Sequence, residues 1–463
     1  MAVVDKYFTI NNSQIVDNYS CTLNQVDIIR NSNKFYIIQL LTDSTNYYLF
    51  TRYGRVGDKG VYSHKLYTNK TQAISEYLKT FKSKTGNIWA TPFVKKAGKY
   101  MLLELETPKM VVINDNSKSN LDLQLDTKVL QFIKLIANKQ LMTNTLINLD
   151  LDTTRMPLGK ISKNQISNAH ILLKYLSDNF TTLSQQDFLQ YSSEFWTIVP
   201  YATRRNITPP IINDLDNIKK CSSLLEALEN LEIAGTILQQ SRSELDIYNS
   251  LGITLTPLSD PNELAILNNY IINTHGKTHK YQLELIQAFK IDKSLQDQQD
   301  TANLFSSISN HYLLFHGSRM SNFMGIISEG LRIPKASQVS NGSTLGRGCY
   351  FADSITKSYN YTYSNETNNT GFVLICEVAL GNPHIVYGCH DVDSVDSGYH
   401  SRMAKGKSTP NHLQFTTLNN VIVPSGSLIP NSEASHSTFL YNEYVIYNIH
   451  QYRFRYLVQL RNY

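Results

Sequence analysis

The pattern of apolar and polar positions changes its period twice along the chain and divides it into three parts. In the first part, residues 35–41 and 47–52 form short apolar runs on either side of the turn-like stretch 42–46, which predicts two neighbouring strands. Residues 71–82 then change to helical spacing, and Gly86 stands where a helix commonly ends. We expect a small β-rich domain with one helix here.

The second part follows a polar, turn-rich stretch at 114–122 that has the composition of a linker, and its period stays helical to about residue 240. Ser162 and Ser223 each precede a glutamine or glutamate by three residues, which is the pattern of a capping box. Prolines near residue 200 interrupt the middle. This region is predicted to be a bundle of four to six helices.

The third part, from about residue 244, mixes the two periods, and strands dominate it. Helices are expected at 260–273 and near 320–330, and strands at 311–316, 372–380, 444–449 and 455–460. With 463 residues, two or three domains are expected. No apolar run approaches the ~20 residues that span a bilayer, and no signal peptide is apparent, so we expect an intracellular protein without a membrane partner.

Cysteine usage and charge narrow the possible partners. The five cysteines are scattered without a C-x-x-C pair, so reduced thiols and no bound metal are expected. Residues 1–110 carry 15 Lys and Arg against 8 Asp and Glu, a net charge of +7 that leaves about −2 for the remainder. A basic first domain favours a polyanion, with nucleic acid as the first candidate, and a solvated basic face is the alternative.

The candidate chemistry lies in three short strings of the last third. His316 offers a ring nitrogen, Tyr350 and Tyr361 offer flat faces, and Glu443 offers a carboxylate. This set matches a ligand with an aromatic ring, a ribose and a bond whose cleavage leaves positive charge on a sugar carbon, which a carboxylate stabilises. A lone carboxylate fits a leaving group that needs no protonation, such as the nicotinamide of NAD.

Glycines 342, 346 and 348 lack the G-x-G-x-x-G spacing and a surrounding βαβ unit, which excludes a dinucleotide-binding fold of that type. NAD is therefore expected as a consumed substrate, with no permanently bound cofactor.

The last third also resembles the catalytic domain of the poly(ADP-ribose) polymerases, a group of diphtheria-toxin-like ADP-ribosyltransferases. The resemblance is colinear over six strings: 314–319 (LFHGSR), 329–333 (EGLRI), 348–353 (GCYFAD), 357–361 (KSYNY), 377–381 (EVALG) and 440–444 (LYNEY). It implies a mixed α/β domain with antiparallel sheets.

The rest of the chain resembles the same family. Residues 156–163 (MPLGKISK) and 195–200 (FWTIVP) are similar to the helical regulatory domain, and 53–57 (YGRVG) and 84–89 (KTGNIW) to a WGR domain. The implied fold is multidomain α+β, with a WGR-like domain at 1–113, an all-α regulatory domain at 122–240 and a catalytic domain at 244–463. Zinc fingers and a BRCT domain are expected to be absent, so the layout resembles the short DNA-dependent members.

The resemblance implies a role for each matching residue. Glu443 stabilises the oxocarbenium ion and orients the attacking hydroxyl, and Lys357 supports its carboxylate. The NAD-binding residues are expected to be His316 on a ribose hydroxyl, Gly317 and Ser358 on the nicotinamide amide, Tyr361 and Tyr350 against the ring, and Ser318 and Arg332 on the adenosine side. Glu443 is the residue that polymerising members keep.

Two departures from the family pattern stand out. Tyr53 replaces the tryptophan that names the WGR motif; it can still stack on a nucleotide with less area, and Arg55 remains for a phosphate. Residues 406–437, on the acceptor side, follow the family only loosely.

These observations lead to one expected function. The chain is expected to be a DNA-break-dependent poly(ADP-ribose) polymerase that modifies proteins, including itself and histones, with room for a specificity-setting partner at the acceptor side. We expect it in the nucleus, with the cytoplasm as the alternative. The alternative functions are a mono-ADP-ribosyltransferase with the same site and a non-enzymatic scaffold that binds DNA ends.

Overall fold

The computed structural model describes residues 3–104, 125–149, 151, 162–203, 207–277, 279–293, 299–339, 345–389 and 394–463. The expected linker at 114–122, Gly342 and most of the 156–163 string lie outside the described residues. The chain forms two compact units. Unit 1 comprises 1–114, 142–236 and 337–339, and unit 2 comprises 115–141, 237–336 and 340–463. The domain boundaries given above remain predictions.

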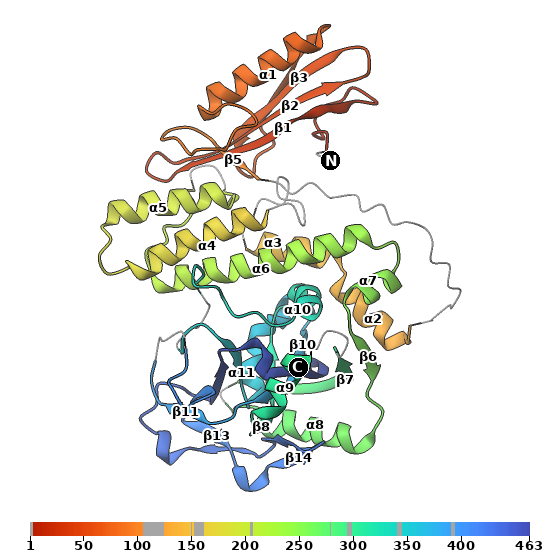
Figure 1. Ribbon diagram of the computed structural model, residues 1–463, viewed down its shortest axis with the longest axis vertical. Helices are drawn as coiled ribbons and strands as arrows, with labels where there is room; N and C mark the ends of the chain where they lie inside the picture. The colour runs from red at the N-terminus through yellow and green to blue at the C-terminus, as the bar shows by residue number, and fades with distance from the viewer. Residues whose placement is uncertain are drawn as a thin grey trace. The chain divides into compact units, whose positions relative to one another are not determined.

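Unit 1 begins with a five-stranded antiparallel sheet in the order β4-β3-β2-β1-β5 (Figure 1). Helix α1 (Lys70–Thr85) covers one face because Ala73, Tyr77 and Phe81 recur at helical spacing and are buried there. The strands are β1 (Gln14–Asp27), β2 (Ser32–Thr42), β3 (Tyr47–Arg55), β4 (Val61–Tyr67) and β5 (Met101–Leu103). The predictions of β2, β3, α1 and the stop at Gly86, whose φ is 71°, are confirmed.

The opposite face of this sheet is closed by the N-terminal segment. Phe8 packs edge-on against Tyr48 and Phe50, with ring centroids 5.6 Å apart in both pairs. The Asp5 carboxylate accepts a hydrogen bond from the Arg52 guanidinium at 2.9 Å, and both side chains are only 5% exposed. Because two buried charges meet here, each depends on the other to remain in the core.

The region between residues 127 and 240 contains five helices in its described part, within the predicted range of four to six. They are α2 (Thr127–Ile136), α3 (Lys139–Asn148), α4 (Lys163–Asp178), α5 (Gln185–Ile198) and α6 (Leu215–Gln240). Ser162 caps α4 by accepting the Gln165 amide at 3.1 Å. The second capping prediction is wrong: Ser223 lies inside α6, which starts eight residues earlier, where the Asp214 carboxylate accepts a backbone amide.

Within unit 1, asparagine side chains of the sheet bind the end of α5 and the residues that follow it. The buried Asn24 amide donates to the carbonyls of Trp196 and Thr197, at 3.0 Å each. The buried Asn33 amide donates to the Tyr201 carbonyl at 2.8 Å. These bonds satisfy carbonyls that a helix end leaves without intrahelical partners, so sheet and helix are joined by directional contacts as well as by apolar packing.

Unit 2 is built on a seven-stranded sheet in the order β14-β15-β8-β10-β18-β7-β6 and a four-stranded sheet in the order β11-β12-β17-β9. Most neighbouring pairs are antiparallel; the exceptions are β11 with β12 and β15 with β8. The first sheet comprises β6 (Thr254–Pro257), β7 (Leu283–Asp292), β8 (His311–Gly317), β10 (Thr370–Ala379), β14 (Thr416–Leu418), β15 (Val421–Val423) and β18 (Tyr452–Asn462). The second comprises β9 (Cys349–Phe351), β11 (Pro383–Val386), β12 (Ser401–Ala404) and β17 (Glu443–Ile446), and a separate pair joins β13 (Ser408–Pro410) to β16 (Leu428–Pro430).

The helices of unit 2 cover these sheets. Besides α2 they are α7 (Glu244–Ser250), α8 (Pro261–Asn273), α9 (Gln299–Ser307), α10 (Phe323–Glu329) and α11 (Ile355–Tyr359). The predicted helices at 260–273 and 320–330 and the strands at 311–316, 372–380 and 455–460 are present. The strand predicted at 444–449 is shorter and ends at Ile446. The predicted multidomain α+β fold with antiparallel sheets is confirmed, and every helix of the described ranges is too short or too polar to span a membrane.

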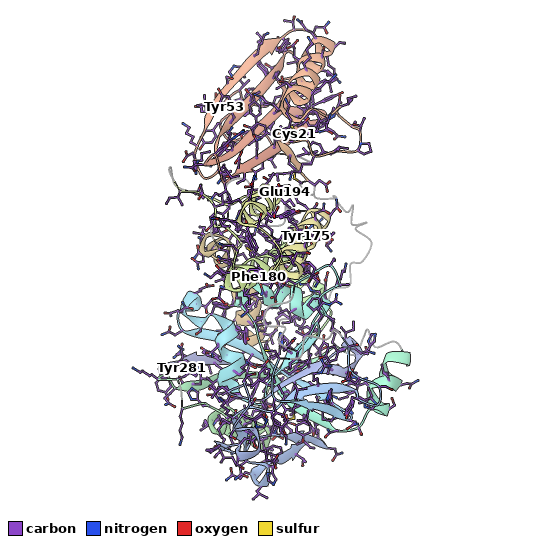
Figure 2. The ribbon with its side chains drawn as sticks, turned by 90° about the vertical axis from the view of Figure 1, so that its left-hand side faces the viewer. Cys21, Tyr53, Tyr175, Phe180, Glu194 and Tyr281 are labelled. Atoms are coloured by element: carbon purple, nitrogen blue, oxygen red, sulfur yellow. The ribbon has the colours of Figure 1, made fainter. Side chains whose placement is uncertain are left out.

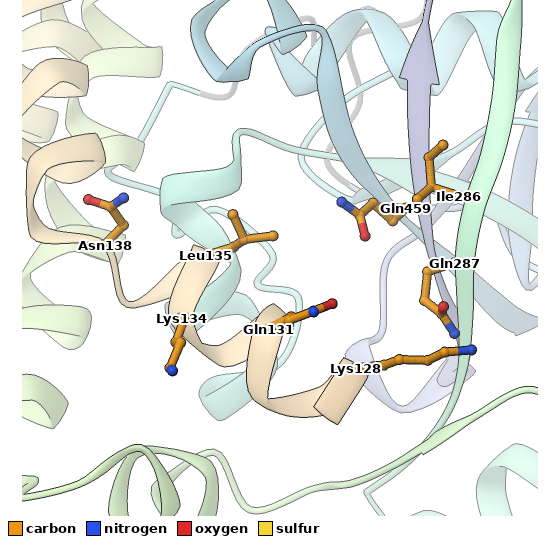
Figure 3. Close-up of a pocket in the computed structure, with 8 residues that line it drawn as sticks. All are labelled: Lys128, Gln131, Lys134, Leu135, Asn138, Ile286, Gln287 and Gln459. Atoms are coloured by element: carbon orange, nitrogen blue, oxygen red, sulfur yellow. The ribbon is translucent and has the colours of Figure 1, made fainter. Parts of the chain in front are cut away.

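Helix α2 packs on the large sheet through its aromatic residue. The buried Phe132 ring lies 5.0 Å from Phe372 and 6.0 Å from Phe289. A groove of about 470 Å³ runs between α2 and strands β7 and β18 (Figure 3). Lys128 and Gln131 of the helix line it opposite Gln287 and Gln459 of the strands.

Candidate active site

Strand β8 pairs with β10 along one edge, whereas its other edge meets β15 at Tyr312 and Ala352 at Phe315. Phe315 exchanges backbone hydrogen bonds with Ala352, at 2.8 and 3.0 Å. Because backbone polar groups of alternate residues face the same edge of a strand, the N–H and C=O of Gly317 point to the side of β8 that faces away from β10. One donor and one acceptor therefore stand side by side, as a carboxamide ligand requires.

Helix α11 approaches this edge so closely that only glycine fits. A Cβ on Gly317 would lie 1.9 Å from the Ser358 carbonyl oxygen. The Ser358 hydroxyl donates to the Phe315 carbonyl at 3.1 Å and is buried. Gly317 and Ser358, predicted to hold the same amide group, are thus in direct contact.

His316 is held in one tautomer by the neighbouring sheet. Its Nδ1 lies 3.0 Å from the Tyr350 carbonyl, which accepts only from a protonated nitrogen, so Nε2 is left as the acceptor of the neutral ring. Burial lowers the pKa of His316, and the bond to Tyr350 opposes this shift. The neutral imidazole is therefore favoured near pH 7.

Glu443 opens strand β17 and is largely buried, 8% exposed. Lys357 of α11 donates a hydrogen bond to its carboxylate. Both charged groups lie close enough to Tyr361 to affect its hydroxyl. Burial raises the pKa of the Tyr361 hydroxyl most; the Lys357 ammonium lowers this pKa, and the Glu443 carboxylate raises it. Tyr361 is still 49% exposed, so its ring is open to a ligand. The structure brings these three predicted residues together.

Tyr350 is fixed at its hydroxyl end. It donates to the Gly346 carbonyl at 2.6 Å and accepts from the Leu345 amide at 3.2 Å. Its ring packs against the cluster of Leu345, Ala404, Phe439 and Val445. The predicted stacking of Tyr350 on a nicotinamide ring stays a prediction.

The two residues expected on the adenosine side differ in exposure. The Ser318 hydroxyl is buried and accepts from the Asn322 amide at 3.0 Å. Arg332 is exposed and lies 3.6 Å from Glu329. Their roles also stay predictions.

A clamp that the sequence reasoning missed holds the segment after Tyr361. The Arg319 guanidinium lies 3.4 Å from the centre of the Tyr363 ring and donates to the Glu366 carboxylate at 2.6 Å. Tyr363 has a φ of 49°, an uncommon conformation for a bulky residue, so the clamp stabilises a strained turn. The signal available in the sequence was only that Arg319 directly follows the 314–318 run.

The two residues expected to contact nucleic acid lie on β3 in unit 1. Figure 2 labels Tyr53 on the sheet of unit 1. Its side chain is 43% exposed and stacks on Tyr36 with ring centroids 5.2 Å apart and planes 7° apart. Arg55 donates to the backbone and side-chain carbonyls of Asn31 and to the carbonyl of Ile207. Tyr53 therefore offers a preformed stacking surface, whereas Arg55 is already engaged by backbone and amide oxygens.

Within the described residues, no group of His, Cys, Asp or Glu side chains is arranged to hold a metal ion. The five cysteines are free thiols, and four of them are buried.

Comparison with known proteins covers nearly the whole chain. The family model of the poly(ADP-ribose) polymerase catalytic domain matches residues 261–462, that of the regulatory domain of the same family matches 123–251, and the WGR domain model matches 19–94. Poly(ADP-ribose) polymerase 2 of Arabidopsis thaliana is 35% identical, over 96% of this chain and 73% of the relative. The Zea mays protein of the same name is 34% identical, over 96% of this chain and 70% of the relative.

A third relative is matched over less than half of its own length. Poly(ADP-ribose) polymerase 1 of Xenopus laevis is 33% identical, over 96% of this chain and 46% of the relative. The plant relatives are matched over more than two thirds of their own length, and all three domains of the family are found in order. The chain belongs to the poly(ADP-ribose) polymerase family, and it is an ADP-ribosyltransferase that consumes NAD.

Proposed function

We propose that the protein is a DNA-break-dependent poly(ADP-ribose) polymerase that transfers ADP-ribose to proteins and to growing chains and releases nicotinamide. The observation that carries the proposal is the pairing of the buried Glu443 carboxylate with Lys357, beside the exposed Tyr361 and in the same unit as Gly317 and Ser358.

Nicotinamide is held through its carboxamide and its ring. The Gly317 N–H donates to the amide oxygen, while the Gly317 carbonyl and the Ser358 hydroxyl complete the contacts of the amide. Tyr361 stacks on one face of the ring and Tyr350 bounds the other. His316, neutral and with Nε2 as its acceptor, takes a hydrogen bond from a ribose hydroxyl.

On the adenosine side, Ser318 and Arg332 hold the other half of the dinucleotide. Arg332 is exposed, so its guanidinium is accessible to a polar ligand.

Transfer proceeds by cleavage of the bond between the nicotinamide nitrogen and the ribose carbon. The bonding electron pair leaves with nicotinamide, which departs neutral, and positive charge develops on the sugar. Glu443 binds the adjacent ribose hydroxyl and stabilises this charge, and its low exposure strengthens the interaction. Lys357 orients the carboxylate through its hydrogen bond. The acceptor oxygen then attacks the ribose carbon and loses its proton.

The proposed DNA dependence is supported by contacts within unit 1. Tyr53 stacks on a nucleotide at a strand end and Arg55 binds a phosphate, which requires Arg55 to release the Ile207 carbonyl. Asn24 and Asn33 of the same sheet bind the carbonyls of residues 196–201. Binding of DNA thus changes contacts of the helical region, which we propose restrains NAD access in the absence of DNA.

Four further assignments belong to the proposal. We propose domain limits of 1–113, 122–240 and 244–463. The acceptors include the protein itself and histones, residues 406–437 accommodate a specificity-setting partner, and the protein acts in the nucleus, where its DNA substrate lies.

The test measures nicotinamide release from NAD and the length of the ADP-ribose product, with and without nicked duplex DNA, on the whole chain and on Glu443→Gln. Arg55→Ala is compared with Arg30→Ala, a matched loss of one arginine from the same domain whose own ion pair to Asp27 is exposed. We expect strong stimulation by DNA, loss of polymer in the Glu443 variant, and weaker stimulation only in the Arg55 variant.

Each other result removes a specific part of the proposal. Turnover that ignores DNA would keep the enzyme and contradict the sensor. Single ADP-ribose units as the product would indicate the mono-transferase. Full polymer formation by Glu443→Gln would contradict the site itself.

A further inference from the structure

A buried carboxylate that the mechanism above does not use lies beside the catalytic residue. Asp353 lies two residues after the end of strand β9 and is 1% exposed. Its Oδ2 accepts hydrogen bonds from the Asn442 amide at 2.7 Å and from the Tyr444 hydroxyl at 2.9 Å. These two donors are the residues on either side of Glu443, so one carboxylate oxygen is bonded to both neighbours of the catalytic residue.

Asn442 is held from further directions as well. Its carbonyl oxygen accepts the Gly406 amide at 2.8 Å, and its amide also donates to the Thr409 hydroxyl at 2.9 Å. Gly406 packs so tightly that a Cβ there would lie 2.3 Å from the Tyr441 carbonyl carbon. The chain that enters Glu443 therefore has little freedom, and Asp353 is the charged acceptor of this network.

Asp353 also precedes the helix that carries Lys357. The next residue, Ser354, donates its hydroxyl to the Thr274 carbonyl at 2.9 Å, and the Gly276 amide donates to the Thr356 hydroxyl at 2.7 Å. The start of α11 is thus fixed to the rest of unit 2. A single turn of the chain links the anchor of Glu443 to the lysine that pairs with it.

The carboxylate is retained at a cost in folding free energy. Burial raises the pKa of Asp353 to about 6, although the bonds from Asn442 and Tyr444 lower it. The folded pKa lies above the ordinary value of 3.8, so the folded state binds the proton more tightly than the unfolded state. The free energy of unfolding therefore decreases as the pH rises from about 4 to about 6, because the proton on Asp353 is lost over this range. An asparagine would be the less costly acceptor if the position served stability alone.

We propose that Asp353 is a positioning residue for the transferase reaction, which keeps the Glu443 carboxylate in its reactive orientation by fixing the main chain on both sides of it. The inference rests on the catalytic role of Glu443 in the proposed function. Active-site groups must be held within about 0.5 Å, and a misplacement of about 1 Å costs about 10²-fold in rate.

The experiment measures kcat and KM for NAD by nicotinamide release, with thermal unfolding at pH 8, on the whole chain. Asp353→Leu removes the acceptor at similar volume, Asp353→Asn keeps an acceptor oxygen without the charge, and Tyr444→Phe removes one donor. Tyr270→Phe is the matched control, because its hydroxyl is equally buried but donates to the Leu313 carbonyl.

We expect kcat of Asp353→Leu to fall by about 10²-fold with KM within about threefold. The kcat of Tyr444→Phe should fall less. The kcat of Asp353→Asn should fall least, and its melting temperature should not decrease. Tyr270→Phe should keep the wild-type kcat. In the double variant Asp353→Leu with Glu443→Gln, the residual rate should equal that of Glu443→Gln alone, because Asp353 acts through Glu443.

Two kinds of result would overturn the inference. Additive losses in the double variant, or equal losses in Tyr444→Phe and Tyr270→Phe, would make Asp353 a general structural residue. If Asp353→Leu does not fold, a wild-type kcat in both Asp353→Asn and Tyr444→Phe would refute the positioning role. Wild-type turnover by Glu443→Gln would instead refute the proposed function.

Discussion

Replacement of Gly317 by alanine tests the closest backbone approach in the active site. The added Cβ would lie 1.9 Å from the Ser358 carbonyl oxygen, whereas real Cβ atoms keep at least about 3.0 Å. The obstacle is backbone, which cannot swing away as a flexible side chain would. Strand β8 and helix α11 must therefore separate by about 1.1 Å or more.

The size of the effect follows from that separation. It moves the Gly317 amide and the Ser358 hydroxyl apart, and these groups are proposed to hold the same carboxamide. A misplacement of about 1 Å costs about 10²-fold in rate, or about 2.7 kcal/mol of transition-state stabilisation. We therefore expect Gly317→Ala to lower kcat/KM for NAD by about 10²-fold.

The assay is nicotinamide release over a range of NAD concentrations, beside thermal unfolding. Gly388→Ala is the matched control, because a Cβ at Gly388 meets no atom within 4 Å and its backbone needs no positive φ. That variant should keep the wild-type kcat/KM. A wild-type value for Gly317→Ala as well would refute the reasoning, because it would mean that β8 and α11 can separate without disturbing the site.

Three further predictions follow from other groups. Asp5→Ala leaves the buried Arg52 charge without its partner and should lower the free energy of unfolding of unit 1 by about 3–5 kcal/mol, whereas Arg30→Ala, from an exposed pair, should change it by less than about 0.5 kcal/mol in urea titrations. Burial lowers the pKa of His316 from 6.5, so its contribution to the free energy of unfolding is complete above pH 6.5 and is lost as the pH falls below that value. His316→Gln should therefore reduce the dependence of the melting temperature on pH below 6.5. An unchanged pH dependence would exclude His316 as its source. Lys357→Met removes the cation that pairs with the catalytic carboxylate and should lower kcat about 10- to 100-fold, and a rate equal to that of wild type would show that the pair has no catalytic role.

The elements that the sequence predicted well are those with a strong local signal. Helix α1 has a regular apolar face and a glycine at its end, and residues 372–376 of strand β10 are a continuous apolar run. Strand β1 was not anticipated, because polar residues interrupt it and a bulge shifts its register between Ile15 and Ser20. Ser223 shows the opposite failure: its capping pattern is real in the sequence, but the helix had already begun at Leu215.

The candidate active site also has a part that the sequence predicted and a part that it did not. The sequence motifs identified Glu443, Lys357 and Tyr361 as candidates, and the fold brings them together over a separation of more than 80 residues along the chain. What could not be predicted is the network around them. The bonds of Asp353 to Asn442 and the stacking of Arg319 on Tyr363 depend on strand register and on an unusual backbone angle, which residue types alone do not specify.

The packing of helix α2 has a practical consequence for anyone who divides this protein into parts. The regulatory family model begins at residue 123, yet the Phe132 ring from that segment covers Phe289 and Phe372 of the catalytic sheet. A recombinant fragment that starts at residue 244 would lack this cover, and the newly exposed apolar surface would favour aggregation. A soluble catalytic fragment should therefore keep α2, joined to the rest by a short flexible connector. The fragment boundary then lies inside the regulatory segment rather than at its end.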